Sequence, residues 1–227
     1  MLKIDSLDVS IQSVRILRDV TLHVAPGQLA GLIGRNGAGK TTLMRSVVGA
    51  LAPARGSIAV AGEPLAGVPM HGRARRGIGY MPEDRRIVPQ LTVEENLMVP
   101  AWAAGTPDAR DRLERIFRMI PEVQHLRLRR GLQLSGGQQK LVALARALMS
   151  GTRLLLLDEP FEGVAPVLAH RLAEVIAILR DEGRSILLSE SDLSHSRRLL
   201  DVVFHIDRGT VTRGPAARPE LRGGGTT

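Results

Sequence analysis

Short apolar runs separated by turn residues make up the first part of the chain. The runs are rich in Leu, Ile and Val, which is typical of buried β-strands. Turn signals such as Pro26-Gly27 and Arg55-Gly56 lie between them. The pattern predicts strands at Leu2–Ile4, Val20–Val24, Leu29–Ile33 and Ile58–Val60.

The middle of the chain has the apolar spacing of helices. Residues 92–120 look helical, with Pro100 and Pro107 as breaks, because proline lacks the amide hydrogen that a helix interior uses. Two further segments repeat apolar residues every three or four positions, so each has one apolar face. These faces are Leu141, Leu144, Ala145 and Leu148 in a helix over Lys140–Leu148, and Leu168, Leu172, Val175, Ile176 and Leu179 in a later helix.

Strand-like runs lie between and after these helices. Strands that alternate with helices form βαβ units, so we expect an α/β fold with a mostly parallel sheet covered on both faces. We find no internal repeat, and we expect the glycine-rich tail, residues 219–227, to be disordered. The later strands are Leu154–Leu157, Ser185–Leu188 and Val202–Ile206, with a turn at Arg208-Gly209 into Thr210–Thr212.

A glycine-rich segment, GRNGAGKTT, follows the predicted strand at Leu29–Ile33 and precedes a helix-forming stretch at Leu43–Val48, which ends at Gly49. It has the form G-x-x-x-x-G-K-[ST] of a phosphate-binding loop, whose backbone N–H groups and helix N-terminus face phosphate oxygens. We expect Lys40 to reach the β- and γ-phosphates of a nucleoside triphosphate and the Thr41 hydroxyl to hold Mg²⁺. The predicted nucleotide-binding residues are Gly34, Arg35, Asn36, Gly37, Ala38, Gly39, Lys40, Thr41 and Thr42.

Lysine is rare in this chain, which makes the lysine of the loop informative. Of 31 Lys and Arg residues, only Lys3, Lys40 and Lys140 are lysines. A compact ammonium fits between phosphate groups where a planar guanidinium does not. The alternative is a chance match to a short pattern, and the strand and helix on either side argue against it.

A second motif, LLLLDEP, combines a buried strand with two carboxylates. The strand Leu154–Leu157 places Asp158 at the carboxyl edge of the sheet, where phosphate sites lie in open α/β folds. We expect Asp158 to orient Mg²⁺ and Glu159 to polarise the attacking water as a general base. The alternative is a pair of solvated turn residues, and a phosphate-binding loop upstream disfavours it.

The composition narrows the class of protein. A chain of 227 residues with 44% hydrophobic residues can bury a substantial core as one large domain or two small ones. No cysteine is present, which excludes disulfides and thiolate metal sites. The start has no secretory signal, and no apolar run approaches the ~20 residues that span a bilayer, so we expect a soluble protein that reaches a membrane only by docking on another protein.

The net charge of +8 leaves several partners open. Solvated arginine-rich faces explain it as well as attraction to nucleotide, to an anionic membrane surface or to nucleic acid does. The basic clusters are not interleaved with aromatic residues, which are 2% of the chain, so we expect no nucleic-acid partner. The clusters are Arg73, Arg75 and Arg76, then Arg85 and Arg86, and then Arg127, Arg129 and Arg130.

Residues 134–138 read LSGGQ, directly before the helix predicted at Lys140–Leu148. Alone, they are a glycine turn with a serine helix cap. In order with GRNGAGKTT and LLLLDEP, they make nearly the whole chain resemble the ATP-binding subunits of ABC transporters. The resemblance implies a single nucleotide-binding domain over residues 1–227, with a P-loop NTPase core, a β-rich subdomain and a helical subdomain inserted at about 89–150.

The resemblance also implies a cycle with ATP and Mg²⁺. Two ATPase subunits, the same or different, pair head to tail, and Ser135, Gly136, Gly137 and Gln138 of one close on ATP held by Lys40 of the other. ATP joins the dimer and hydrolysis releases it. Transmembrane permease subunits are the direct partners, a periplasmic binding protein is an indirect one, and the place of action is the cytoplasmic face of the inner membrane.

Two longer segments resemble one branch of the family. Residues 80–97, YMPEDRRIVPQLTVEENL, and residues 158–166, DEPFEGVAP, are similar to the ATPase subunits of branched-chain amino acid importers and their relatives for urea and short amides. The first segment falls where the family contacts its membrane subunits. An ATPase subunit never touches the transported molecule, so these segments leave the substrate open.

Four positions depart from the general family pattern. Glu83 replaces the usual glutamine as a metal contact, and Ala165 replaces an aspartate; the importer branch resembles the chain at both. Ile11 replaces an adenine-stacking aromatic residue, so we expect weaker nucleotide affinity by ~1 kcal/mol. Ser191 replaces the switch histidine that contacts the γ-phosphate, and His195 follows about one helical turn later.

These departures keep three functions open. The leading one is an ATPase that energises a membrane importer, which Glu159 and the complete phosphate-binding loop favour. The second is a regulatory or assembly subunit that binds ATP with little turnover, which Ser191 and Ile11 favour. The third is an ABC-type protein acting on ribosomes or DNA; such proteins carry two cassettes or long inserts, and this sequence has neither.

Overall fold

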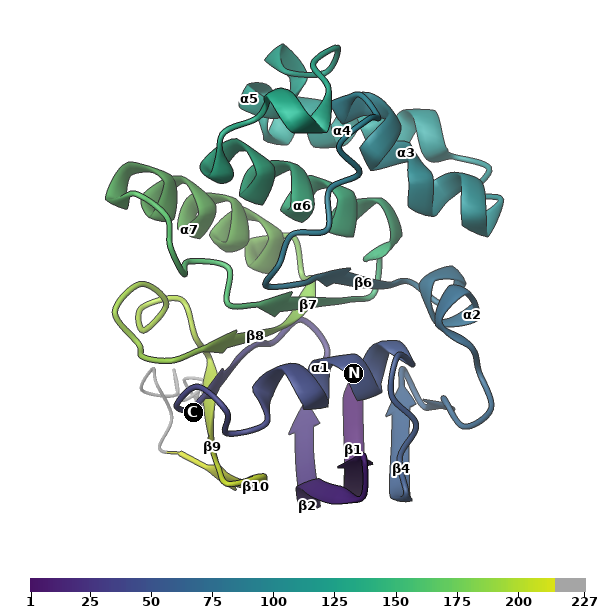
Figure 1. Cartoon of the computed structure of the whole chain (residues 1–227), viewed down its shortest axis with the longest axis vertical. Helices are drawn as coiled ribbons and strands as arrows, with labels where there is room; N and C mark the ends of the chain where they lie inside the picture. The colour runs from purple at the N-terminus through teal and green to yellow at the C-terminus, as the bar shows by residue number, and fades with distance from the viewer. Residues whose placement is uncertain (215–227) are drawn as a thin grey trace, which may run out of the picture.

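A computed structural model describes residues 1–214, and the tail predicted at 219–227 lies outside the described residues. Figure 1 shows two sheets with a helix between them and a layer of helices on the far side of the larger sheet. No helix within residues 1–214 is both long and apolar enough to cross a bilayer.

The smaller sheet is antiparallel and is built from the N-terminal part of the chain. Its strands are longer than the apolar runs predicted, because polar residues on the outward face continue the pairing. In spatial order it contains β2 (Val14–Val24), β1 (Leu2–Ile11), β4 (Arg55–Val60) and β5 (Glu63–Pro64).

The larger sheet is parallel apart from its last strand, as predicted. Its central strands are buried at every position and are mostly apolar, which is expected of a sheet covered on both faces. In spatial order it contains β10 (Thr210–Arg213), β9 (Val202–Asp207), β3 (Leu29–Ile33), β8 (Ser185–Glu190), β7 (Leu154–Asp158) and β6 (Ile78–Met81).

Alternate side chains of each central strand divide the interior into two cores. In β7, Leu155 and Leu157 belong to the core under the helices, whereas Leu154 and Leu156 belong to the core facing the smaller sheet. Helix α1 (Lys40–Val48) lies between the two sheets and packs its apolar residues into the second core (Figure 1). The carboxyl ends of β3, β7 and β8 therefore meet beside the start of α1.

Helices cover the other face of the larger sheet. Helix α6 was predicted to have one apolar face, and this was wrong: residues 141–145 are all buried, because α6 packs against α3, α4 and α5 on one side and β6 and β7 on the other. A side chain at Gly79 of β6 would collide with the carbonyl of Ala147, so glycine there permits the close approach. The helices are α3 (Val93–Ala104), α4 (Ala109–Met119), α5 (Pro121–His125), α6 (Gly136–Ser150) and α7 (Pro166–Asp181), with a 3₁₀ turn at Gly131–Gln133.

Pro100 does not break the helix as predicted. Helix α3 runs through it to Ala104, and the break falls at Gly105, whose φ of 64° ends the helix, before Pro107. Val93, Leu97 and Ala101 of α3 are buried, and this packing outweighs the hydrogen bond that proline removes. A shorter helix, α2 (Met70–Arg75), had no periodic signal and was not predicted.

One member of the basic clusters is structural. Arg73 is buried, and its guanidinium donates to the main-chain carbonyls of Ser46, Val47, Leu65 and Val68. These bonds help to satisfy carbonyls at the end of α1 and before α2, where an unpaired buried polar group is costly. Arg73 thus joins α2 to the end of α1, and part of the positive charge has no external ligand.

Candidate nucleotide-binding site

The predicted phosphate-binding loop connects β3 to α1. Gly37 and Gly39 have φ of 80° and 112°, values that favour glycine, and a side chain at Gly34 would collide with the carbonyl of Ile206. No side chain caps the start of α1 at Gly39. The first-turn N–H groups of α1 are therefore available to an anion.

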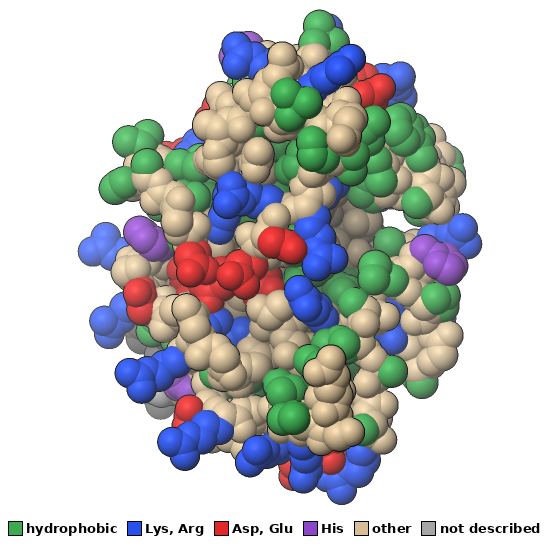
Figure 2. Space-filling model, in the orientation of Figure 1, with side chains coloured by type: hydrophobic (Ala, Val, Ile, Leu, Met, Phe, Trp, Pro, Cys, Tyr) green, Lys and Arg blue, Asp and Glu red, His purple; other side chains and the backbone are tan. Residues whose placement is uncertain are grey.

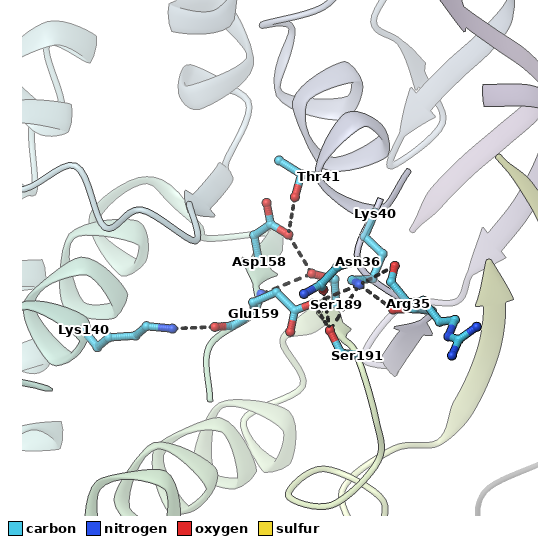
Figure 3. Close-up of polar contacts among 10 residues, drawn as sticks. Arg35, Asn36, Lys40, Thr41, Lys140, Asp158, Glu159, Ser189 and Ser191 are labelled. Atoms are coloured by element: carbon cyan, nitrogen blue, oxygen red, sulfur yellow. Dashed lines mark hydrogen bonds and ion pairs between the residues drawn. The ribbon is translucent and has the colours of Figure 1, made fainter. Parts of the chain in front are cut away.

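Lys40 is the first residue of α1 and is 5% exposed. Its ammonium donates to the carbonyls of Gly34 and Arg35, the latter at 3.2 Å, and lies 3.0 Å from Oε1 of Glu159 (Figure 3). The hydroxyl of Ser191 lies 3.4 Å from the same ammonium. The loop and the ends of β7 and β8 thus converge on one cation.

Asp158 is fully buried at the end of β7, and three hydroxyls donate to its carboxylate. Thr41 Oγ1 lies 3.3 Å and Ser189 Oγ 2.7 Å from Oδ1, and the Tyr80 hydroxyl lies 3.1 Å from Oδ2. Burial, with the Asp158 charge next, raises the pKa of the Tyr80 phenol, so Tyr80 remains a donor at neutral pH.

The hydroxyl of Thr41 and the carboxylates of Asp158 and Glu83 are oxygen donors, which is the set that Mg²⁺ prefers. Partial burial, and then neighbouring carboxylates such as Glu162 and Asp158, raise the pKa of Glu83. A cation bound beside Glu83 would relieve this repulsion. The residues present therefore fit a magnesium ion that also takes oxygens from phosphate.

Glu159 has an unusual backbone conformation, with φ of 47° in a residue that is not glycine. Its N–H lies 3.1 Å from Ser189 Oγ and 3.2 Å from the Ser189 carbonyl. Its own carbonyl accepts a hydrogen bond of 2.6 Å from the Lys140 ammonium. Its carboxylate is 3.0 Å from Lys40 and 3.0 Å from the Ser191 hydroxyl. Each polar group of Glu159 is held by a different element.

Lys40, Thr41, Glu83 and Glu159 border a cavity of about 460 Å³. Ile11 does not line it; this residue is 38% exposed at the end of β1, next to the hairpin turn. Ile16, which had no sequence signal, lines it instead. Arg35 contributes its carbonyl to Lys40, and Ala38 is buried in the core facing the smaller sheet. The lining residues are Ile16, Asn36, Gly37, Gly39, Lys40, Thr41, Thr42, Glu83 and Glu159.

A second cavity, of about 210 Å³, shares Asn36 and Glu159 with the first. The Ser191 hydroxyl lies 2.9 Å from Asn36 Oδ1, and the His195 ring stacks on Phe161 with centroids 5.4 Å apart. Residues 191–199 form bends and turns, not the helix assumed in placing His195. Figure 2 shows acidic side chains gathered near the middle of the face of the molecule in view, with Lys and Arg side chains nearby. Carboxylates lining this cavity are Glu159, Glu162, Glu190 and Asp192.

The LSGGQ residues lie apart from both cavities, at the start of α6. Ser135 caps the helix: its hydroxyl accepts from the Gln138 N–H at 3.3 Å, and its own N–H donates to the Gln138 side chain at 3.0 Å. Ser135 and Gly136 are exposed, and Gly137 and Gln138 are partly exposed. A second molecule can therefore reach them.

Sequence reasoning missed Ser189, Tyr80 and Lys140 as parts of the site. Ser189 follows a predicted strand, so its position at the carboxyl edge was available as a signal. Tyr80 and Lys140 reach the site from β6 and α6, and only the packing of these elements brings them there.

A family model described as ABC transporter matches residues 17–162. A curated relative is the high-affinity branched-chain amino acid transport ATP-binding protein BraG of Pseudomonas aeruginosa, 36% identical over 93% of this chain and 91% of its own length.

Two further similarities are to a transport protein of another kind and to a solved structure. The lipopolysaccharide export system ATP-binding protein LptB of Haemophilus influenzae is 38% identical over 93% of this chain and 88% of its own length. A solved structure of an ATP-binding subunit of an ABC transporter superposes with a TM-score of 0.83 at 30% identity, covering 94% of this chain and 89% of the other.

The site contains one carboxyl group with a strongly shifted titration. Glu190 ends β8 and is 4% exposed, and its carboxylate accepts from the Ser196 hydroxyl. Burial, reinforced by the charges of Glu159 and Asp192, raises the pKa of Glu190 from 4.5 to about 7. Below pH 4.5 the group is neutral in both the folded and the unfolded chain. Above pH 7 it is ionised in both, so the burial penalty lowers the stability of the folded chain.

Glu190→Gln is therefore expected to raise the free energy of unfolding at pH 8 by roughly 1–3 kcal/mol, with a gain that shrinks towards zero at pH 5. Urea denaturation at both pH values measures the difference. Glu114→Gln, at an exposed position of α4, is the matched control and should change little at either pH. An equal effect of Glu190→Gln at the two pH values would contradict the shifted pKa.

Proposed function

Since this chain belongs to the ABC transporter family and is an ATP-binding subunit with ATPase activity, we propose that it energises a membrane importer by hydrolysing ATP in the site described above. The observation that supports this most directly is the convergence of Lys40, Thr41 and Glu159 on one cavity, with Asp158 hydrogen-bonded to Thr41 behind its wall. The proposed helical subdomain of this ATPase spans about residues 89–150.

In the proposed reaction, the N–H groups of residues 37–42 and the Lys40 ammonium bind the phosphates. Thr41 and Asp158, with Glu83 beside them, would hold Mg²⁺, which when bound would neutralise charge on the phosphate oxygens. Ile16 offers an aliphatic surface at the cavity wall, and Ile11 completes the base contact only if the hairpin end moves towards it.

Glu159 acts as the general base for the attacking water. The carboxylate is 6% exposed and shares Lys40 with the phosphate site. When phosphate takes the ammonium, the Glu159 carboxylate loses its ion-pair partner and becomes a stronger proton acceptor. The Ser191 hydroxyl, 3.0 Å from Glu159 and 2.9 Å from Asn36, orients the carboxylate or the water.

The working unit is a head-to-tail dimer formed with ATP, either with a second copy or with a different ATPase subunit. The exposure of Ser135 and Gly136 at the start of α6 supports this, since they must meet ATP bound to the other subunit. Transmembrane permease subunits bind the dimer at the cytoplasmic face of the inner membrane, and a periplasmic binding protein delivers the solute to them.

The transported solute proposed here is a branched-chain amino acid or a related small polar molecule. Residues 80–97 and 158–166 and the similarity to BraG support it.

The similarity to LptB is as strong, so the direct test is transport. The membrane proteins that co-purify with the chain should give ATP-dependent leucine uptake into proteoliposomes, and Lys40→Ala should abolish it. Release of lipopolysaccharide with no uptake of amino acids would contradict the importer.

The ATPase role predicts that Glu159→Gln lowers phosphate release at least about 100-fold and traps an ATP-bound dimer. Phosphate release and size exclusion with ATP measure the two effects. Lys40→Ala is the matched control and should remain monomeric because it binds no ATP. Unchanged phosphate release, or a monomer at saturating ATP, would count against Glu159 as the base.

A second candidate function is a regulatory or assembly subunit that binds ATP with little turnover. The neutral Ser191 favours it, because the residue in this position of the family is a histidine that contacts the γ-phosphate. Ser191→His should raise kcat severalfold if the missing imidazole limits turnover, and steady-state kinetics with purified protein measure this. Ser194→His, in the same cavity, is the control. No gain with Ser191→His would show that the serine does not limit turnover.

A further inference from the structure

Lys140 makes a contact that the nucleotide motifs do not explain. It is one of three lysines in the chain, it is 3% exposed, and its ammonium donates at 2.6 Å to the main-chain carbonyl of Glu159. In Figure 3, Lys140 and Lys40 reach Glu159 from opposite sides. Lys40 contacts the carboxylate, whereas Lys140 contacts the backbone.

The backbone of Glu159 needs such a partner. A residue other than glycine in the left-handed region carries of order 1–3 kcal/mol of strain and keeps it only where its surroundings hold it. Ser189 holds the N–H side of Glu159, and Lys140 holds the carbonyl side. The Glu162 N–H also donates to this carbonyl, at 3.3 Å, so without the ammonium the carbonyl would keep only this longer bond within its own turn and would lose its link to α6.

The surroundings of Lys140 are acidic. Burial lowers its pKa, with a smaller contribution from Arg85, while Glu162, Glu159 and Glu83 oppose this fall. Burying a cation costs solvation energy, and attraction to nearby carboxylates offsets part of that cost. Here it offsets the negative charge that surrounds the general base.

Lys140 also belongs to the helix that begins at the LSGGQ residues. It lies four residues after Gly136 on α6, which is about 6 Å along the helix. Arg85 donates to the Gly136 carbonyl at 3.2 Å, two residues after Glu83 of the nucleotide cavity. The start of α6 is therefore linked to the nucleotide site of the same chain through both Arg85 and Lys140.

We propose that Lys140 is a positioning residue: its ammonium fixes the backbone of Glu159 to helix α6 and so sets where the catalytic carboxylate points. This rests on the proposed function, since it takes Glu159 as the general base. A purely structural buried lysine would instead affect stability and ATP binding as much as turnover.

Lys140→Met keeps the volume and removes the donor. We expect kcat to fall about 10-fold while KM for ATP stays within twofold, because Lys140 touches no nucleotide-binding group other than Glu159. The decisive measurement is a double-mutant cycle. In a Glu159→Gln background, Lys140→Met should have little further effect on the residual rate, since the base it positions is already gone.

Arg146→Met is the matched control. Arg146 lies on the same helix and also donates to main-chain carbonyls, those of Arg85 and Arg86, each at 2.6 Å. Its effect should be the same with and without Glu159→Gln. An effect of Lys140→Met that is equally large in both backgrounds, or a KM that rises with the fall in kcat, would overturn the proposal.

Chemical rescue keeps the test valid if Lys140→Met folds poorly. The chain has no cysteine, so Lys140→Cys introduces a single thiol. Alkylation of the unfolded chain with 2-bromoethylamine, followed by refolding, restores an ammonium of nearly the original reach, and iodoacetamide gives an uncharged cap. Recovery of kcat with the amine only supports the proposal, and equal rates with both caps refute it. If Glu159→Gln alone leaves the rate unchanged, the general-base assignment fails instead.

Discussion

The buried ion pair between Lys40 and Glu159 is the contact on which the site depends. Both side chains are almost fully buried, and 3.0 Å separates their charged atoms. A buried charge without a partner is strongly destabilising, so each holds the other in place while no phosphate is bound. A phosphate that enters the loop competes for the same ammonium. In the proposed reaction, nucleotide binding and release of Glu159 as the base are consequently one event.

The parallel sheet makes this pair possible. In β3, β7 and β8 the chain runs in the same direction, so the phosphate-binding loop, the two carboxylates and Ser191 all follow the same edge. The strands are apolar on both faces, which leaves their carboxyl ends as the place where polar groups gather. Hydroxyls from neighbouring strands then satisfy Asp158, which no solvent reaches.

Local motifs could be predicted from sequence where one segment supplies both the geometry and the chemistry. The loop between Leu29–Ile33 and α1, and the strand ending at Asp158, are of this kind. Lys140 and Tyr80 could not be predicted, since packing of separate elements brings them to the site. The same reason explains why α6 does not have the single apolar face that its sequence predicts. Apolar spacing reveals the side of a helix that packs against one neighbour, whereas α6 is enclosed by helices on one side and by the sheet on the other. Pro100 shows the converse, a strong local signal overruled by burial of its neighbours.

Ser191 stands where the family resemblance leads one to expect a histidine, and it lies in an acidic region. Glu190 and Asp192 flank this position in sequence, and Glu159 lies 3.0 Å from its hydroxyl. An imidazole there would be drawn towards its protonated form and would offset charge beside the γ-phosphate, whereas a hydroxyl only donates or accepts a hydrogen bond. With serine at this position, the positive charge around Glu159 must come from other residues. Lys40 supplies it on the phosphate side and Lys140 on the backbone side, the two buried lysines of a chain that otherwise relies on arginine. A compact ammonium enters a crowded site that a guanidinium does not, which explains why lysine stands on both sides of Glu159 in a chain whose other cations are almost all arginine.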